Sequence, residues 1–417
     1  MKSKTPDQHS PSRLSQITPI VRGLLANSTA NEDMPYELVI LKSLTNSEAI
    51  DFAGSAANAE AQRYPAPLVR GPMPPLFIDA VDYDAAPEAL RRQLGDAISA
   101  YSARYNSKPE IICLRGLGIL YHDPGCPMPD TRKGRKSRVE NRESSIGPDL
   151  PLHNKVAMVT GAAGAIGYGV CRGLIEKGCH LAATDLPGKK LDDFVADLKQ
   201  IGSDRVIGVP IDVTKKESVS RGFEGVIQTW GGIDIVVVNA GIPLVANLKD
   251  IDLNAFRKLE KVNVEGALLT LAEAARLFIL QGTGGDIIVI STKNVPAPGA
   301  GFGAYSATKA ACHQLGRIAS IELAPYGVRV NMVSPDGVFS EGKYKSGLWE
   351  QIGPDRMRAR GLDEKGLQDY YRNRNLLKLR VTGRHVANAV LFFATRQTPT
   401  TGATIPVDGG LPDATPR

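Results

Sequence analysis

Cysteine and histidine are scarce in this chain of 417 residues. The five cysteines (Cys113, Cys126, Cys171, Cys179 and Cys312) are odd in number and include no CxxC pair, which argues against a disulfide framework and a zinc ribbon. The six histidines include no HxH pair, so the sequence predicts no metal site. Scarce, unpaired cysteines favour a reducing compartment, and we expect a cytoplasmic protein.

Long apolar runs are also missing. A run such as Ile233–Val238 is strand-length and far shorter than the roughly 20 residues of a membrane span. The first residues, MKSKTPDQHSPSRLSQ, are polar and lack the apolar segment of a signal peptide. The net charge is only +6, from 50 basic and 44 acidic residues, and favours neither a nucleic-acid nor a membrane partner.

The remaining composition is that of an ordinary globular protein, with 42% hydrophobic and 23% charged residues, and the length suits two domains. In the first part, PEALRRQLGDAISAYSARYN predicts an amphipathic helix, and PEIICLRGLGILYHD predicts two short strands about Gly116 and Gly118. The helix would bury Leu90, Leu94, Ile98 and Tyr101 on one face. The predicted organisation is a flexible N-terminus (1–35), a small α+β domain (36–122), a linker (123–152), a larger domain (153–410) and a tail (411–417).

The larger domain alternates apolar runs with helical patterns. Six segments are strand-like: KVAMVTG, HLAATDL, VIGVPID, IDIVVVNAG, GDIIVIST and VRVNMVSP. Continuous rather than alternating apolar residues indicate strands buried on both faces, as in a parallel sheet. The prediction is therefore an α/β fold with a doubly wound parallel (Rossmann) sheet, which binds ligands at the carboxyl ends of its strands.

The first of these strands runs into the glycine-rich turn TGAAGAIG. Gly161, Gly164 and Gly167 would let the backbone approach a pyrophosphate at the start of the following helix. Asp185, at the end of the next strand, can accept hydrogen bonds from ribose hydroxyls and would repel a 2′-phosphate, and Leu186 follows it instead of a basic residue. The turn and this carboxylate predict NAD as the cofactor in preference to NADP.

These motifs, together with IDV, NAG, KVN, IST, YSATK, VSPDGV and TGATIPVDGG, resemble the short-chain dehydrogenase/reductase family over about 60% of the chain. The resemblance implies that Asp212 and Val213 frame the adenine, and that the loop after the sixth strand, Pro335 to Val338, meets the nicotinamide. Ala165 replaces a family glycine, and Asp336 stands where the family has glycine after Pro335. The cofactor-binding set so predicted is Gly161, Gly164, Ile166, Gly167, Asp185, Leu186, Asp212, Val213, Asn239, Ala240, Gly241, Tyr305, Lys309, Pro335 and Val338.

The catalytic prediction centres on a tyrosine and a lysine. A free tyrosine, with a pKa of about 10, is too weakly acidic to serve as a base near neutral pH. Lys309 lies four residues after Tyr305, one helical turn away, and its charge favours the phenolate. The family's serine corresponds to Thr292, thirteen residues before Tyr305, with Ser291 as the alternative hydroxyl. The resemblance also implies that Asn263 holds a proton-relay water.

The segment 337–380 corresponds to the family's substrate lid. Residues from Gly337 to Val381 include ten basic residues against six acidic ones, which favours an anionic substrate, although a solvated helical lid explains the same charges. The substrate residues predicted here are Ser291, Lys293, Tyr344 and Trp349.

The sequence also resembles, more narrowly, the dehydrogenase half of bifunctional rhamnulose-1-phosphate aldolase/lactaldehyde dehydrogenases, and sorbitol-6-phosphate dehydrogenases share a similar lid. The segments that carry this narrower resemblance are STKNVPAPGAGFGAYSATKAA, VSPDGVFSEGKYKSGLW and DYYRNRNLLKLRV. The resemblance implies that residues 36–122 are a reduced aldolase-like remnant without metal. It also implies a homodimer or homotetramer, since such domains commonly pair long helices.

The predicted function is an NAD-dependent oxidoreductase that interconverts a secondary alcohol and a ketone on a small polyol, sugar or phosphorylated substrate. One alternative keeps the fold but oxidises an aldehyde, such as lactaldehyde, or epimerises its substrate through a transient ketone. The other alternative is an NAD-binding scaffold without activity. The departures at Thr292 and Asp336 favour this alternative, and the Tyr305–Lys309 pair argues against it.

Overall fold

The computed structural model describes residues 12–61, 63–123, 150–340, 342–344 and 346–412. The predicted linker, 123–152, lies almost wholly outside these residues, as does most of the predicted tail. The chain divides into two units. The first consists of Met1–Pro148 with Phe223–Ile233 and Ile279–Thr283, and the rest of the chain forms the second. Among the described residues, no helix is long and apolar enough to cross a membrane.

The first unit contains a four-stranded sheet in the order β3-β6-β5-β4. Strands β5 (Ile111–Leu114) and β6 (Gly118–His122) are the two strands expected about the glycines. Alternate residues of the sheet face two separate cores, one against α2 (Ser47–Ala53) and the other against α4 (Pro87–Tyr105) and α1. The remaining elements are β1 (Asn27–Ser28), β2 (Tyr36–Glu37), β3 (Leu41–Leu44), α3 (Ala56–Glu60) and β4 (Leu76–Ile78).

Helix α1, Arg13–Leu25, corrects the expectation of a flexible N-terminus through residue 35. The side chain of Ser12 caps this helix by accepting a hydrogen bond from the Ser15 amide. Its apolar face is buried in the first unit, where Ile17 and Val21 are fully covered, so packing stabilises a helix in spite of Pro19 within it. Helix α4 buries Leu90, Leu94, Ile98 and Tyr101, as its amphipathic pattern predicts.

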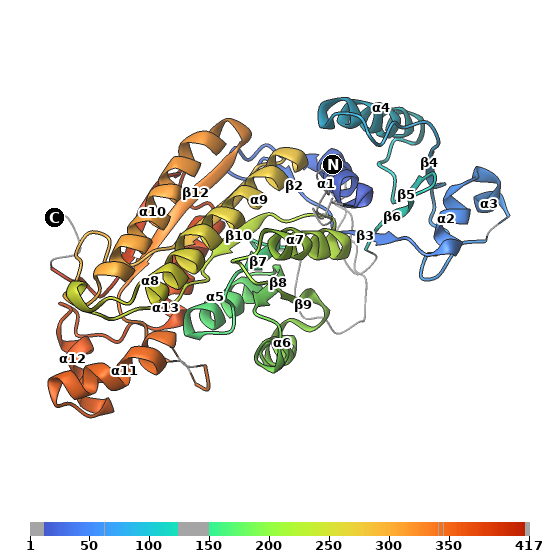
Figure 1. The fold of residues 1–417 in the computed structure, drawn as a ribbon. Coiled ribbons are helices and arrows are strands. Elements are labelled where there is room, and N and C mark those ends of the chain that lie inside the picture. The colour runs from blue at the N-terminus through green and yellow to red at the C-terminus, as the bar shows by residue number, and fades with distance from the viewer. Residues whose placement is uncertain (1–11, 62, 124–149, 341, 345, 413–417) are drawn as a thin grey trace, which may run out of the picture. The chain divides into compact units, whose positions relative to one another are not determined.

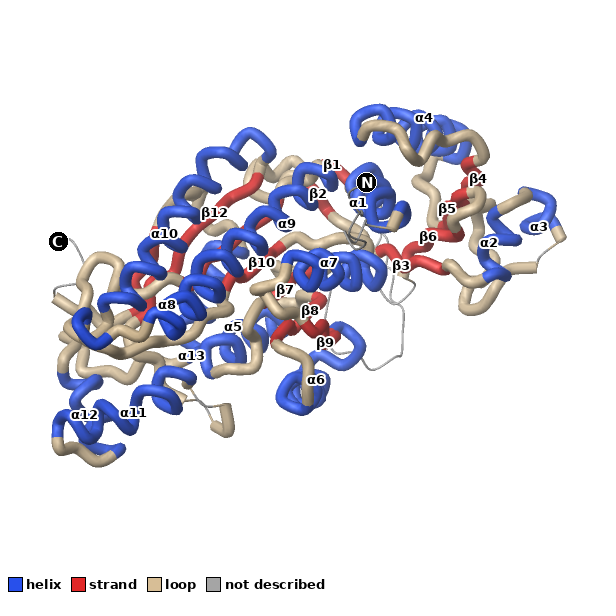
Figure 2. Tube along the Cα trace, viewed as in Figure 1, coloured by secondary structure: helices blue, strands red, loops and turns tan. Residues whose placement is uncertain are grey.

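The second unit is built on a seven-stranded parallel sheet in the order β13-β12-β11-β10-β7-β8-β9, in which β13 is Thr404–Val407. The chain extends the sheet from β7 through β8 to β9 on one side and from β10 to β13 on the other. The sheet is therefore doubly wound, as expected, with its switch point between β7 and β10. In Figure 2, the strands labelled β7 to β10 and β12 are red among blue helices. The six predicted strand segments are all present. They are β7 (Val156–Val159), β8 (His180–Asp185), β9 (Val206–Pro210), β10 (Ile235–Val238), β11 (Gly285–Ile290) and β12 (Val328–Pro335).

One face of this sheet is covered by α5 (Ala165–Glu176), α6 (Lys189–Gly202) and α13 (Gly383–Ala394). Apolar residues of these helices share a core with Val159, Val237 and Ile290, whose side chains point to the same face. The helices from α7 to α12 are also labelled in Figure 1, and α9 and α10 are long. They are α7 (Lys216–Trp230), α8 (Leu253–Glu260), α9 (Gly266–Gln281), α10 (Gly303–Leu323), α11 (Gly347–Arg360) and α12 (Glu364–Asn373).

Candidate active site

A pocket of about 1070 Å³ opens at the carboxyl ends of the strands in the second unit. Its walls come from the segments that follow β7, β8, β9, β10, β11 and β12. This is the edge where a doubly wound sheet binds its ligands. Every residue in the predicted cofactor-binding set lines this pocket, from Gly161 to Val338.

The glycine-rich turn fits the pocket wall for two different reasons. Gly161 has φ of +59°, and a Cβ there would lie 2.7 Å from the Ala240 Cα, so only glycine allows the turn to pass this close to the end of β10. A Cβ on Gly164 would meet no described atom within 4 Å, so this backbone borders open space. Gly164 precedes α5 without a side-chain cap, which leaves the helix amides there for an anionic ligand.

Hydrogen bonds between side chains and the backbone fix the strand ends around this turn. The Asn239 amide group donates to the carbonyls of Thr160 at 2.9 Å and Gly161 at 2.8 Å. Asp185 accepts from the amide of Ala163 at 2.9 Å, which holds its carboxylate beside the turn and on the pocket wall. The residues present therefore fit an adenine dinucleotide, with a cradle for phosphate and a carboxylate for ribose hydroxyls.

Tyr305 and Lys309 lie in the same pocket, on the first turns of α10. The ring of Tyr305 meets Phe302 edge-on, with centroids 6.1 Å apart. Lys309 is 5% exposed, and its Nζ donates to the carbonyl of Ile290 at 2.8 Å, at the end of β11. This hydrogen bond directs the ammonium toward the strand end that carries the candidate hydroxyls.

The two candidate hydroxyls differ in their partners. The Oγ of Ser291 lies 2.9 Å from Nδ1 of His313 on α10, whose Nε2 lies 3.5 Å from the Thr404 hydroxyl. Within the part of the chain that the structure describes, the Oγ1 of Thr292 accepts a hydrogen bond from the amide of Asn294 alone, at 3.3 Å, so its proton is available to a ligand. Both residues line the pocket, and these bonds favour Thr292 as the hydroxyl that meets substrate.

Asn263 does not line the pocket, in contrast with the other predicted catalytic residues. It lies in a π-helical segment, Lys261–Glu265, between α8 and α9, and is 1% exposed. Its Oδ1 accepts from the amide of Ile242 at 2.9 Å, and its Nδ2 donates to the carbonyl of Ile242 at 3.0 Å. The side chain therefore supports the loop after β10, and this loop borders the pocket.

Asp336, the residue that departs from the family pattern, has a clear partner. Its carboxylate forms a two-pronged ion pair with the Arg374 guanidinium, with Nε to Oδ2 at 3.0 Å. Asp336 is at the carboxyl end of β12, and Arg374 directly follows α12. The pair therefore ties the end of the lid to the sheet.

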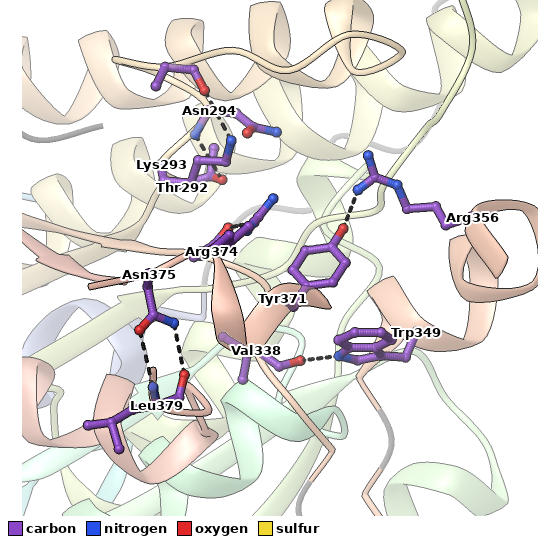
Figure 3. Close-up of polar contacts among 12 residues, drawn as sticks. Thr292, Lys293, Asn294, Val338, Trp349, Arg356, Tyr371, Arg374, Asn375 and Leu379 are labelled. Atoms are coloured by element: carbon purple, nitrogen blue, oxygen red, sulfur yellow. Dashed lines mark hydrogen bonds and ion pairs between the residues drawn. The ribbon is translucent and has the colours of Figure 1, made fainter. Parts of the chain in front are cut away.

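The structure places Tyr344 and Trp349, expected to meet substrate, outside this pocket. Tyr344 stacks on Tyr168 of α5 with centroids 4.2 Å apart. The indole of Trp349 donates to the Val338 carbonyl at 2.8 Å and packs on Phe339 within the lid (Figure 3). Tyr344 thus attaches the start of the lid to the main core of this unit, whereas Trp349 belongs to a small core within the lid.

Other pocket residues were missed as individual site residues. Lys293 and Ser291 line the pocket as expected, but so do Asn294, Arg356, Tyr371 and Arg374. The basic composition of the lid indicated arginines without identifying which ones face inward. Asn294 carried no signal beyond its place next to Lys293.

The comparisons with known proteins identify the family. The family model for short chain dehydrogenase matches residues 155–351. Zerumbone synthase of Zingiber zerumbet is 32% identical over 280 residues, which cover 63% of this chain and 96% of that protein. Sorbitol-6-phosphate 2-dehydrogenase of Escherichia coli (strain K12) is 29% identical over 62% of this chain and 98% of that protein. The chain belongs to the short-chain dehydrogenase/reductase family and is an oxidoreductase of the class acting on CH–OH groups.

Solved structures lead to the same family. A short-chain type dehydrogenase/reductase from Mycobacterium marinum superimposes with a TM-score of 0.54 at 27% identity, covering 63% of this chain and 98% of that one. A longer relative, the uncharacterized oxidoreductase YuxG of Bacillus subtilis (strain 168), is 33% identical over 65% of this chain. The matched segment spans only 39% of the length of YuxG.

Proposed function

We propose that this protein is an NAD-dependent dehydrogenase that interconverts a secondary alcohol and a ketone on a small polyol or sugar, with or without an anionic group. The observation that carries the proposal is the meeting of Tyr305, Lys309 and Thr292 in one pocket with the glycine-rich turn. NAD, when bound, accepts a hydride from the alcohol carbon or returns it to the ketone.

The chain's own residues manage the proton. Thr292 and Tyr305 hydrogen-bond the reacting oxygen, and the phenolate of Tyr305 takes the hydroxyl proton during oxidation or returns it during reduction. Lys309, held by the Ile290 carbonyl, stabilises that phenolate by its charge. Asn263 positions the loop after β10 beside them.

The cofactor preference rests on Asp185, which lines the pocket and would face a ribose. A carboxylate accepts hydrogen bonds from both ribose hydroxyls of NAD and repels the 2′-phosphate of NADP. Reduction of each cofactor by wild type and Asp185→Ala tests this point. We expect the preference for NAD to fall at least about tenfold in the variant; an unchanged preference would remove Asp185 from the assignment.

The reaction itself is tested by absorbance of reduced nicotinamide across a panel of polyols, sugars and their phosphates. We expect turnover by wild type and its loss in Tyr305→Phe, with cofactor binding kept. Tyr305→Phe turning over at the wild-type rate would contradict the mechanism. Retention of NAD with epimerised product and no net reduction would favour the epimerase alternative.

For the first unit we keep the proposal of a reduced aldolase-like domain without metal. It is supported by the small four-stranded sheet of this unit. Stoichiometric zinc in the purified protein would contradict it. A homodimer or homotetramer is supported by Ile318 and Ile321 on α10, which are 42% and 76% exposed.

A further inference from the structure

The lid side of the pocket carries several cationic side chains. Lys293 follows Thr292 directly and is half-buried, and among the described residues its Nζ donates to the Ala297 carbonyl alone, at 3.2 Å. Arg356, on α11, lines the same pocket, and within the described part of the chain neither cation forms an ion pair. Arg374 differs from both, because Asp336 takes up its charge.

The guanidinium of Arg356 is held in a fixed orientation by aromatic groups. It lies over the ring of Phe302 at 4.7 Å and over that of Tyr371 at 5.6 Å, and it also donates to the Tyr371 hydroxyl (Figure 3). A guanidinium has five N–H donors, so most of these donors remain available to a ligand. Rigid donors of this kind match the oxygens of phosphate and carboxylate groups.

Asn294 adds an unpaired acceptor to the same wall. It lines the pocket and is 6% exposed, and its Oδ1 has no hydrogen-bond partner among the described residues. A buried acceptor without a donor is unfavourable, so its presence beside a ligand pocket points to a donor on the ligand. A hydroxyl group of the substrate supplies such a donor.

We propose that Lys293 and Arg356 form a subsite for a terminal oxyanion of the substrate, a phosphate or a carboxylate, while Asn294 accepts a hydrogen bond from a substrate hydroxyl. This inference rests on the proposed function, because the carbinol of the same molecule has to reach Tyr305 and Thr292. The opposing charges do not cancel the subsite: Asp336 is paired with Arg374, and Glu350, the other carboxylate on this wall, is exposed. The substrate class is thus a hydroxylated anion.

Binding to the full chain loaded with NADH tests the subsite without turnover of the alcohol. The probes are sorbitol, sorbitol 6-phosphate, gluconate and inorganic phosphate, titrated by calorimetry at constant ionic strength. We expect sorbitol 6-phosphate to bind at least about tenfold more tightly than sorbitol, as charge-assisted hydrogen bonds to two cations require. Gluconate shows whether a carboxylate is sufficient. Failure of all three anions to bind, or equal binding of sorbitol and the anions, overturns the proposal.

Variants separate charge recognition from a structural role. Arg356→Gln and Lys293→Gln are each expected to weaken sorbitol 6-phosphate about tenfold or more and to leave sorbitol within about twofold. Asn294→Leu is expected to weaken both ligands alike, because it removes a contact to a hydroxyl. Arg358→Gln is the control: Arg358 is an exposed residue of α11 outside the pocket, and its loss should change neither affinity. Equal loss of sorbitol and its phosphate in Arg356→Gln overturns the proposal.

The subsite and the reaction fail in different ways. If Tyr305→Phe keeps tight binding of sorbitol 6-phosphate and wild type produces no reduced nicotinamide, the anion subsite stands and the dehydrogenase mechanism falls. If wild type oxidises sorbitol and its phosphate equally well and Arg356→Gln changes neither rate, the mechanism stands and the subsite falls.

Discussion

At the residue scale, two neighbouring hydroxyls after β11 have different surroundings. Ser291 is bonded to His313 of α10, which in turn lies near Thr404 of β13, so the serine links three elements of the second unit. Thr292 accepts one backbone amide and keeps its proton free for the pocket. We therefore expect the serine hydroxyl to stabilise the fold and the threonine hydroxyl to contact the substrate.

Substitution of each hydroxyl tests this division. We expect Thr292→Ala to lower kcat/KM about a hundredfold, because a positioned hydrogen bond to the reacting oxygen is lost. Ser291→Ala should keep kcat/KM within about threefold and lower the midpoint of urea unfolding, since His313 loses a partner. Rates are followed by absorbance of reduced nicotinamide. The opposite pattern would assign the catalytic hydroxyl to Ser291.

The charge of Lys293 predicts a pH dependence of anion binding. Burial lowers the pKa of Lys293 below its usual value of about 10.5, as do the charges of Arg374 and Arg356, while Asp336 and Tyr370 oppose this shift. Anion affinity should therefore be constant at neutral pH and fall as the pH rises through that lowered pKa. Titrations of sorbitol 6-phosphate with the NADH-bound chain measure it. Lys293→Arg should remove the alkaline fall; sorbitol as ligand should lack it, and a parallel fall with sorbitol would exclude Lys293 as its cause.

At the element scale, the start of the lid is attached to helices α5 and α6 of the second unit. Tyr344 stacks on Tyr168 of α5, meets Phe194 of α6 edge-on at 5.2 Å, and donates its hydroxyl to Asp197. Helix α5 also begins at the glycine-rich turn, so one helix touches both the lid and the cofactor wall. The Tyr344–Tyr168 contact therefore joins the lid to the helix that begins at the glycine-rich turn.

Removal of the Tyr344 ring should loosen the lid. Aromatic pairs contribute about 0.5–1.5 kcal/mol each, so we expect Tyr344→Ala to raise the substrate KM about two- to tenfold and to speed amide exchange in the lid. Tyr344→Phe keeps the ring contacts and serves as the matched control, with a change below about twofold. Hydrogen exchange by mass spectrometry measures the lid directly. Unchanged exchange in Tyr344→Ala would mean that other contacts hold this segment.

The elements differ in how far the sequence predicts them. Strands β7, β10 and β11 follow from continuous apolar runs rich in Val and Ile, because burial on both faces leaves this simple pattern. β13, Thr404–Val407, was missed: it is half exposed and contains Pro406, so its residues alternate without forming an apolar run. Helix α1 was missed because its polar flank and Pro19 resemble a flexible segment, and only its burial in the first unit explains the helix.

The residues of the candidate site also differ in how far the sequence predicts their positions. The cofactor wall was predictable because each motif directly follows a strand, and parallel strands bring their carboxyl ends to one edge. The lid was not, since the direction of each side chain depends on packing between residues distant in the chain. Tyr344 packs on helix α5 and Trp349 packs in the lid core. Asp336 forms an ion pair with Arg374.

At the scale of the whole molecule, each of the two units contains one tryptophan, whose fluorescence can report its unfolding. The chain has two tryptophans, and Trp230 belongs to the first unit while Trp349 belongs to the second. A Trp349→Phe background therefore makes tryptophan fluorescence a probe of the first unit, because Trp230 is 2% exposed and unfolding would expose it. The stability of that unit can be followed while the catalytic unit is present.

His122, at the end of β6, gives the first unit a predicted sensitivity to acid. Burial lowers the pKa of His122 from 6.5 to about 4, with Asp123 opposing the shift. Between these values the unfolded chain binds a proton that the folded unit excludes, so stability is complete above pH 6.5 and falls as the pH decreases toward 4, by up to about 3 kcal/mol. Urea unfolding at pH 7.5, 5.5 and 4.5, followed by Trp230 fluorescence, should show this loss. His122→Gln should reduce the slope of stability against pH, and an unchanged slope would transfer the acid sensitivity to other groups.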